Sequence, residues 1–179
     1  MAEDKNKFLN QSGKDGLILA GIAIAYFIIS ALLGKTEKGG FLLSLLSFVL
    51  WAAKLALCIW LMFVFLRRFA NENGKDRSRT FRFGMAIAAC SALVYAGFYL
   101  LYVTKIDPGF FAGMFDSVAQ TYSSFLNSEE IDRIMNMESS MPSITFFTNL
   151  IWCWLVGTII SAIASNNICG SDNPFENEN

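Results

Sequence analysis

The chain has 179 residues, of which 54% are apolar and only 16% are charged, and its net charge is −1. Soluble domains average about 25% charged residues, and the charges of this chain are clustered, with long uncharged stretches between them. This distribution excludes a soluble globular domain, a disordered chain and a nucleic-acid-binding protein, and it leaves an integral membrane protein.

Four apolar segments are long enough to cross a bilayer, at about 17–33, 41–66, 84–103 and 144–164. A hydrocarbon core of about 30 Å requires about 20 apolar residues in a helix. The first apolar run exceeds the length of a signal-peptide core, which is about 7–15 residues, so we interpret it as an uncleaved span. The sequence therefore predicts an all-α membrane protein with four transmembrane helices.

The charges also predict the limits of this membrane domain and its orientation. We expect a cytoplasmic segment at 1–15, the membrane domain at 16–165 and a disordered cytoplasmic tail at 166–179. Nine of the 14 basic residues precede the first span or lie between the second and third spans, and four lie on the other side. Because short cytoplasmic loops are enriched in Lys and Arg, both termini are predicted to be cytoplasmic. The basic second loop is explained by topology and attraction to anionic lipid, with a specific binding role as the less favoured alternative.

The long loop between the third and fourth spans is predicted to carry an amphipathic helix at about 108–127. Asp107 is a good helix cap and Pro108 suits a first helical position. The segment is too polar to span, so it fits the outer membrane interface. It is either a lid over the bundle or, less favoured, a docking surface for a partner. The candidate interface residues are Phe111, Phe115, Tyr122 and Phe125.

A second short helix is expected after Ser128, ended by Pro142. Small residues four apart, in Gly84-x3-Ala88 and Gly157-x3-Ser161, allow membrane helices to approach closely. Such pairs are frequent by chance in helices rich in Ala and Ser.

Lys54 is the single charged residue within the four apolar segments. A lysine near the centre of a membrane helix costs roughly 2.5–3.5 kcal/mol, and such residues usually face the bundle interior. At a rise of about 1.5 Å per residue, Tyr26 and Tyr95 lie at a similar depth, and Asn149 lies closer to the outer side. We therefore predict that Lys54 hydrogen-bonds to Tyr26, Tyr95 or Asn149 in an intramembrane polar site. The alternative, which we favour somewhat, is that Lys54 snorkels to an interface or is purely structural.

Catalytic signatures are missing from the sequence. The chain has no histidine, no span holds a carboxylate, and no nucleotide-binding or hydrolase motif occurs. The four cysteines have no metal-ligand spacing. We therefore expect no enzyme activity, no metal and no cofactor.

A family resemblance fits this layout. The stretch FRFGMAIAACSALVYAGFYLLYVTKIDPGF, with Phe83-Gly84 at its start and Asp107-Pro108 at its end, resembles the bacterial four-span membrane family catalogued as domain of unknown function 4199. The resemblance covers about 16–165 and implies the architecture and a location in the bacterial inner membrane, but no activity. The expected role is an interaction, assembly or accessory component. Its partners would be the bilayer, a second copy or another membrane protein, and the alternative is a small oligomeric channel or transporter using Lys54.

Overall fold

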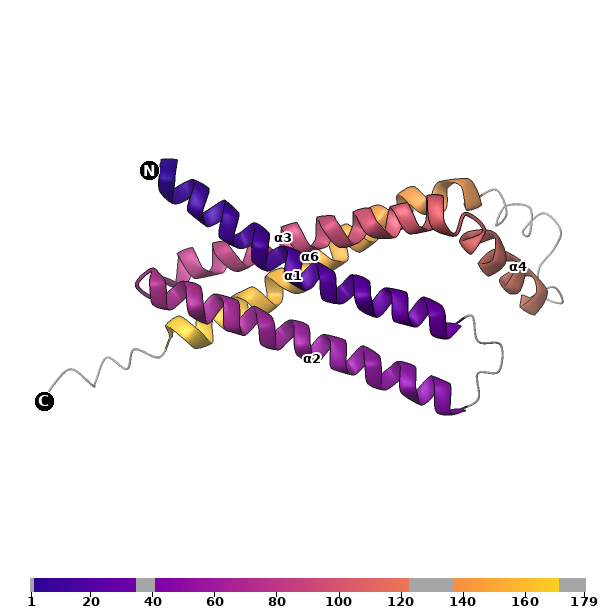
Figure 1. Cartoon of the computed structure of the whole chain (residues 1–179), viewed down its shortest axis with the longest axis horizontal. Coiled ribbons are helices and arrows are strands. Elements are labelled where there is room, and N and C mark those ends of the chain that lie inside the picture. Colours follow the sequence, from indigo (N-terminus) through magenta and orange to yellow (C-terminus); the bar gives the residue numbers. More distant parts are fainter. Residues whose placement is uncertain (1, 35–40, 123–136, 171–179) are drawn as a thin grey trace, which may run out of the picture.

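Four long helices form a bundle in which each runs antiparallel to the next one along the chain (Figure 1). The computed structural model describes residues 2–34, 41–122 and 137–170. The long helices are α1 (Ala2–Gly34), α2 (Phe41–Glu72), α3 (Arg77–Leu101) and α6 (Met141–Cys169). The shorter elements are the π-helix η1 (Tyr102–Ile106), α4 (Phe110–Tyr122) and the 3-10 helix η2 (Glu138–Ser140). These ranges contain no strand.

All four long helices are long and apolar enough to cross a membrane, which confirms the predicted all-α membrane fold. The apolar stretches run over Asn6–Leu33, Leu45–Glu72, Arg77–Ile106 and Met141–Cys169. Each overlaps one of the four segments expected from the sequence. Large apolar side chains are exposed along all of these helices, as expected for surfaces that face lipid rather than water.

Helices α1 and α6 extend beyond the apolar segments expected from the sequence. Residues 2–15 form the first turns of α1, and Phe8 makes T-shaped contacts with Phe69 and Phe83. At the other end α6 continues to Cys169, where the Gly170 N–H donates to the Asn166 carbonyl. Residues 166–169 are thus helical, and 171–179 lie outside the described residues. Apolar periodicity marks only the part of a helix within lipid, so it cannot show these polar extensions.

The connection between α2 and α3 is a tight turn. Gly74 has φ 81° and Lys75 has φ 55°, a left-handed conformation that costs a glycine little. Asp76 then caps α3, because its carboxylate accepts from the backbone N–H groups of Ser78 at 2.9 Å and Arg79 at 3.4 Å. The turn therefore fixes where α3 begins.

Helices α3 and α6 make the most extensive contact in the bundle, and small residues lie at its closest points. A Cβ on Gly84 would lie 2.5 Å from the Ser161 hydroxyl oxygen, and a Cβ on Gly157 would lie 2.5 Å from the Ala88 Cβ. The two small-residue pairs noted in the sequence are therefore partners of each other, in antiparallel register. The Ser161 hydroxyl donates to the Gly157 carbonyl, so it is satisfied within α6.

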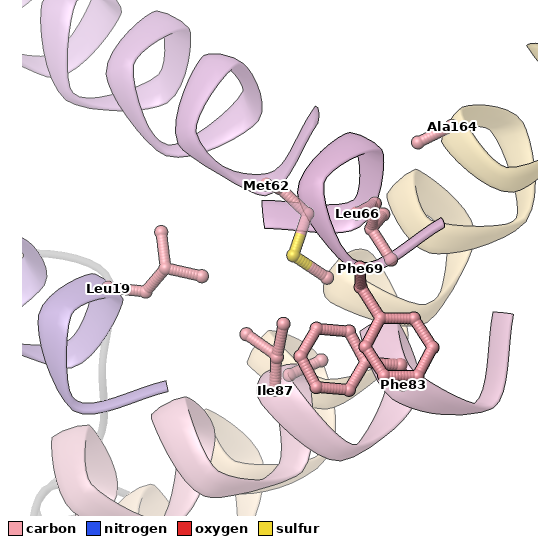
Figure 2. Close-up of a cluster of buried hydrophobic side chains, with 8 residues drawn as sticks. Leu19, Met62, Leu66, Phe69, Phe83, Ile87 and Ala164 are labelled. Atoms are coloured by element: carbon pink, nitrogen blue, oxygen red, sulfur yellow. The ribbon is translucent and has the colours of Figure 1, made fainter. Parts of the chain in front are cut away.

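The main apolar core lies at the end of the bundle that carries the α2–α3 turn (Figure 2). Its side chains come from all four long helices. The Phe69 and Phe83 rings stack with centroids 3.9 Å apart and an interplanar angle of 7°. The buried members of this core are Leu19, Met62, Leu66, Phe69, Phe83, Ile87, Ala88 and Ala164.

A second apolar cluster closes the opposite end. The last turn of α3 widens into the π-helix η1, where the Asp107 N–H donates to the Tyr102 carbonyl. Helix α4 then begins at Phe110, later than the predicted start at Pro108, because Asp107 and Pro108 belong to the turn that reverses the chain.

Pro142 lies in the first turn of α6, a position that tolerates proline. The predicted helix after Ser128 and the end of the outer helix after Tyr122 lie outside the described residues.

Candidate intramembrane site around Lys54

Helix α2 places the Lys54 side chain, which is half-buried, against rings from two neighbouring helices. The Lys54 Nζ lies 4.9 Å from the centroid of the Tyr26 ring on α1 and 5.6 Å from that of the Tyr95 ring on α3. Both distances are within the range of about 6 Å at which an ammonium is attracted to an aromatic face. Three of the four residues predicted for a polar site are therefore adjacent.

The interaction differs in kind from the one predicted. We expected hydrogen bonds from Lys54, whereas its ammonium lies over the faces of the tyrosine rings. Among the described residues, Lys54 has no ion pair, and no contact joins it to Asn149, which is half-buried on α6. Spacing along a helix shows which residues lie on the same side of the helix and at a similar depth in the membrane. It does not show whether a tyrosine turns its hydroxyl, the edge of its ring or the flat side of its ring toward Lys54.

One thiol shares the helical face of Lys54. Cys58 follows Lys54 by four residues on α2 and is half-buried. The rings of Tyr26 and Tyr95 come from α1 and α3, so side chains from three long helices meet at the ammonium.

The ring contacts partly offset the cost of burying a charge. A cation–π contact contributes about 0.5–1 kcal/mol at exposed sites and about 2 kcal/mol when desolvated, against an insertion cost of roughly 2.5–3.5 kcal/mol for a lysine at a helix centre. Two such contacts make an inward lysine tolerable without a carboxylate. They direct the ammonium toward α1 and α3, whereas a snorkelling lysine extends along the helix to the interface.

The predicted interface residues of the outer helix have different positions. Phe111 and Phe115 are each 6% exposed and pack with Tyr102 and Val103 at the end of α3. Tyr122 is the last residue of α4, and Phe125 lies outside the described residues. Two of the four side chains are thus covered by this chain, as expected for a lid, and a docking role of the helix stays a prediction.

The described part of the chain holds no group of three or more Cys, Asp or Glu side chains arranged to bind a metal ion. Its four cysteines are unpaired thiols. The Lys54 site therefore offers one cation and two phenol rings inside a membrane domain.

Comparisons with known proteins agree with the family resemblance seen in the sequence, and they assign no activity to the chain. Neither the curated proteins nor the solved structures contain a match to the chain. A family model described as a protein of unknown function, DUF4199, matches residues 14–166. This match covers all four apolar segments and most of the chain, so the protein belongs to the DUF4199 family.

Proposed function

We propose that this protein is a non-catalytic component of the bacterial inner membrane that works by associating with a second copy or with another membrane protein. In the proposed orientation both termini are cytoplasmic, because nine of the 14 basic residues lie before the first apolar segment or around the α2–α3 turn. The observation that carries the proposal is the first half of α2, in which no described side chain is fully buried and only Leu50, Lys54 and Leu55 are half-buried.

The two halves of α2 differ sharply in packing. In the second half, buried side chains recur at helical spacing and belong to the main apolar core. In the first half, Phe48 is 62% exposed and Trp51 is 47% exposed, and the intervening turns show no buried position. The exposed positions are 45–49 and 51–53. In Figure 1 this part of α2 runs away from α3 and α6, whereas α1 stays packed at the end of α3, where the ring centroids of Phe27 and Tyr102 are 4.9 Å apart.

The composition of this half-helix favours a helix partner over lipid alone. Ser47, Ala52 and Ala53 are small and exposed, and small residues allow a second helix to approach closely within a membrane. Lys54 follows directly, so a partner helix there would also shield the half-buried ammonium from lipid. An interaction role therefore explains both the open side of the bundle and the position of its cation.

Photo-crosslinking in native membranes tests this role. A benzophenone amino acid at Phe48 or Trp51 is expected to give protein adducts, with the mass of two chains for self-association. The same probe at Leu93, which is exposed on the outward face of α3, is the matched control and should yield lipid adducts. Lipid adducts alone at all three positions would overturn the proposal.

The Lys54 site supports a second candidate function, a small oligomeric channel or transporter. It is favoured by the convergence of two phenol rings, from α1 and α3, on the half-buried cation of α2. A hydrated pathway would let a charged, water-soluble methanethiosulfonate reagent reach Cys58 and Cys153. Cys90 lies at the close contact between α1 and α3 and provides an internal control. Failure of all three thiols to react in folded protein, with reaction after denaturation, would exclude the aqueous pathway.

A further inference from the structure

A groove runs along the outside of the bundle at the end that carries the α2–α3 turn. It has a volume of about 860 Å³ and lies between the second half of α2 and the end of α6. We call its apolar lining the floor and its polar lining the mouth. The floor is Ile59, Trp60, Phe63 and Val64, and the mouth is Arg67, Asn71, Lys75 and Asn167. The groove is therefore amphipathic along its length.

The groove is about as long as one leaflet of a bilayer with its headgroups. Its lining on α2 runs from Ala56 to Asn71, a distance of about 22 Å at 1.5 Å per residue. One half of a bilayer of about 40–45 Å, headgroup regions included, is similar. Because Arg67 lies near the end of the apolar stretch that closes at Glu72, the mouth is at headgroup level and the floor is at acyl-chain level.

Two cations at the mouth have no acidic partner among the described residues. Arg67 and Lys75 are exposed and line the groove, whereas the neighbouring Arg68 pairs with Glu72 at 3.2 Å. The amides of Asn71 and Asn167 also lie at the mouth. Guanidinium, ammonium and amide N–H groups together are donors suited to phosphate oxygens.

We propose that this groove binds an anionic phospholipid, with its phosphate at Arg67 and Lys75 and one acyl chain along Trp60 and Phe63. The positive charges of Arg67 and Lys75 favour a headgroup with a net negative charge. A zwitterionic headgroup is disfavoured because it carries a positive charge of its own. A free phosphate would use the mouth but leave the exposed apolar floor uncovered. This inference requires membrane insertion but not the partner proposed above, since the groove uses the second half of α2.

Native mass spectrometry of the full chain in detergent tests the inference. Phosphatidylglycerol and phosphatidylcholine with identical acyl chains are added in parallel. Wild-type protein is expected to retain phosphatidylglycerol preferentially. The double variant Arg67→Gln/Lys75→Gln should bind it at least about tenfold more weakly, as expected from the loss of two basic contacts near an anionic surface. Its affinity for phosphatidylcholine should not change.

The matched control removes two charges elsewhere. Lys14 and Arg82 are exposed and do not line the groove, so Lys14→Gln/Arg82→Gln should bind phosphatidylglycerol like the wild type. Equal weakening in both double variants would show a general charge effect and overturn the site. Full competition by soluble glycerophosphoglycerol would show a phosphate site rather than a lipid groove. A wild type without preference between the two lipids would likewise overturn the inference.

Discussion

Gly84 of α3 lies so close to Ser161 of α6 that a single added methyl group would come within 2.5 Å of the serine hydroxyl and 2.9 Å of Leu66. Two helices and a core side chain from a third meet at this glycine. Because lipid tails are as apolar as leucine, membrane helices associate through close packing rather than through the hydrophobic effect. This contact is therefore central to the stability of the bundle.

Gly84→Ala is expected to destabilise the protein. The methyl group would have to displace Ser161 or Leu66, and overpacking of this kind costs typically 1–3 kcal/mol. For a chain of this size, a drop in Tm of several degrees follows, at roughly 2–4 °C per kcal/mol, measurable by circular dichroism in detergent. Gly97→Ala in the same helix is the control, since its methyl group would meet nothing within 4 Å. Equal Tm values for the two variants would contradict the packing argument.

Tyr26 is expected to stabilise the bundle through Lys54. In a double-mutant cycle, Tyr26→Leu should cost more with Lys54 present than in a Lys54→Met background, by about 0.5–2 kcal/mol for the lost cation–π contact. Tyr26→Phe keeps the ring and should behave like the wild type. Lys54→Met itself should leave Tm unchanged or raise it, because a desolvated charge is removed. If Tyr26→Leu has the same cost in both backgrounds, the ring does not interact with the ammonium.

The sequence predicted the faces of the helices better than their partners. The cost of a charge within the membrane indicated an inward face for Lys54, and rise per residue placed Tyr26 and Tyr95 at a similar depth. The Lys54 ammonium lies 4.9 Å and 5.6 Å from the centroids of these two rings. The pairing of Gly84 with Ser161 could not be predicted, because periodicity along one helix does not specify the register of another. The packing of Phe8 on the core was missed for a related reason: a polar segment before a span carries no periodic apolar signal.

Phe83 is expected to be the most sensitive aromatic residue of the core. It is fully buried and stacks on Phe69, with Phe8 against its edge. Phe83→Ala should cost about 3–5 kcal/mol, as for other large-to-small changes at buried phenylalanines. Phe147→Ala on the outside of α6, where the side chain is exposed, serves as the control and should change Tm little. Chemical unfolding followed by circular dichroism compares the two, and similar losses would contradict the assignment of the core.

Asp76 is expected to stabilise the start of α3 by capping. Asp76→Ala removes the acceptor for the Ser78 and Arg79 N–H groups and should cost about 0.5–2 kcal/mol. Asp76→Asn keeps an acceptor oxygen but removes the charge, so it should retain most of the stability. Thermal melts of the three proteins separate the two contributions. A loss as large in Asp76→Asn as in Asp76→Ala would assign the effect to charge near the basic turn instead of to the cap.

The proposed orientation predicts which exposed positions a membrane-impermeant maleimide reaches in intact cells. The basic residues around the α2–α3 turn favour the cytoplasmic side, and α6 ends on the same side as that turn (Figure 1). With the four native cysteines replaced by alanine, single cysteines at Ser78 and Asn167 should be labelled only after permeabilisation. A cysteine at Gly109, which is exposed before α4 at the opposite end, should be labelled directly. The reverse pattern would invert the topology and place the proposed lipid groove in the outer leaflet, whereas labelling of Ser78 and Asn167 from opposite sides would contradict the fold itself.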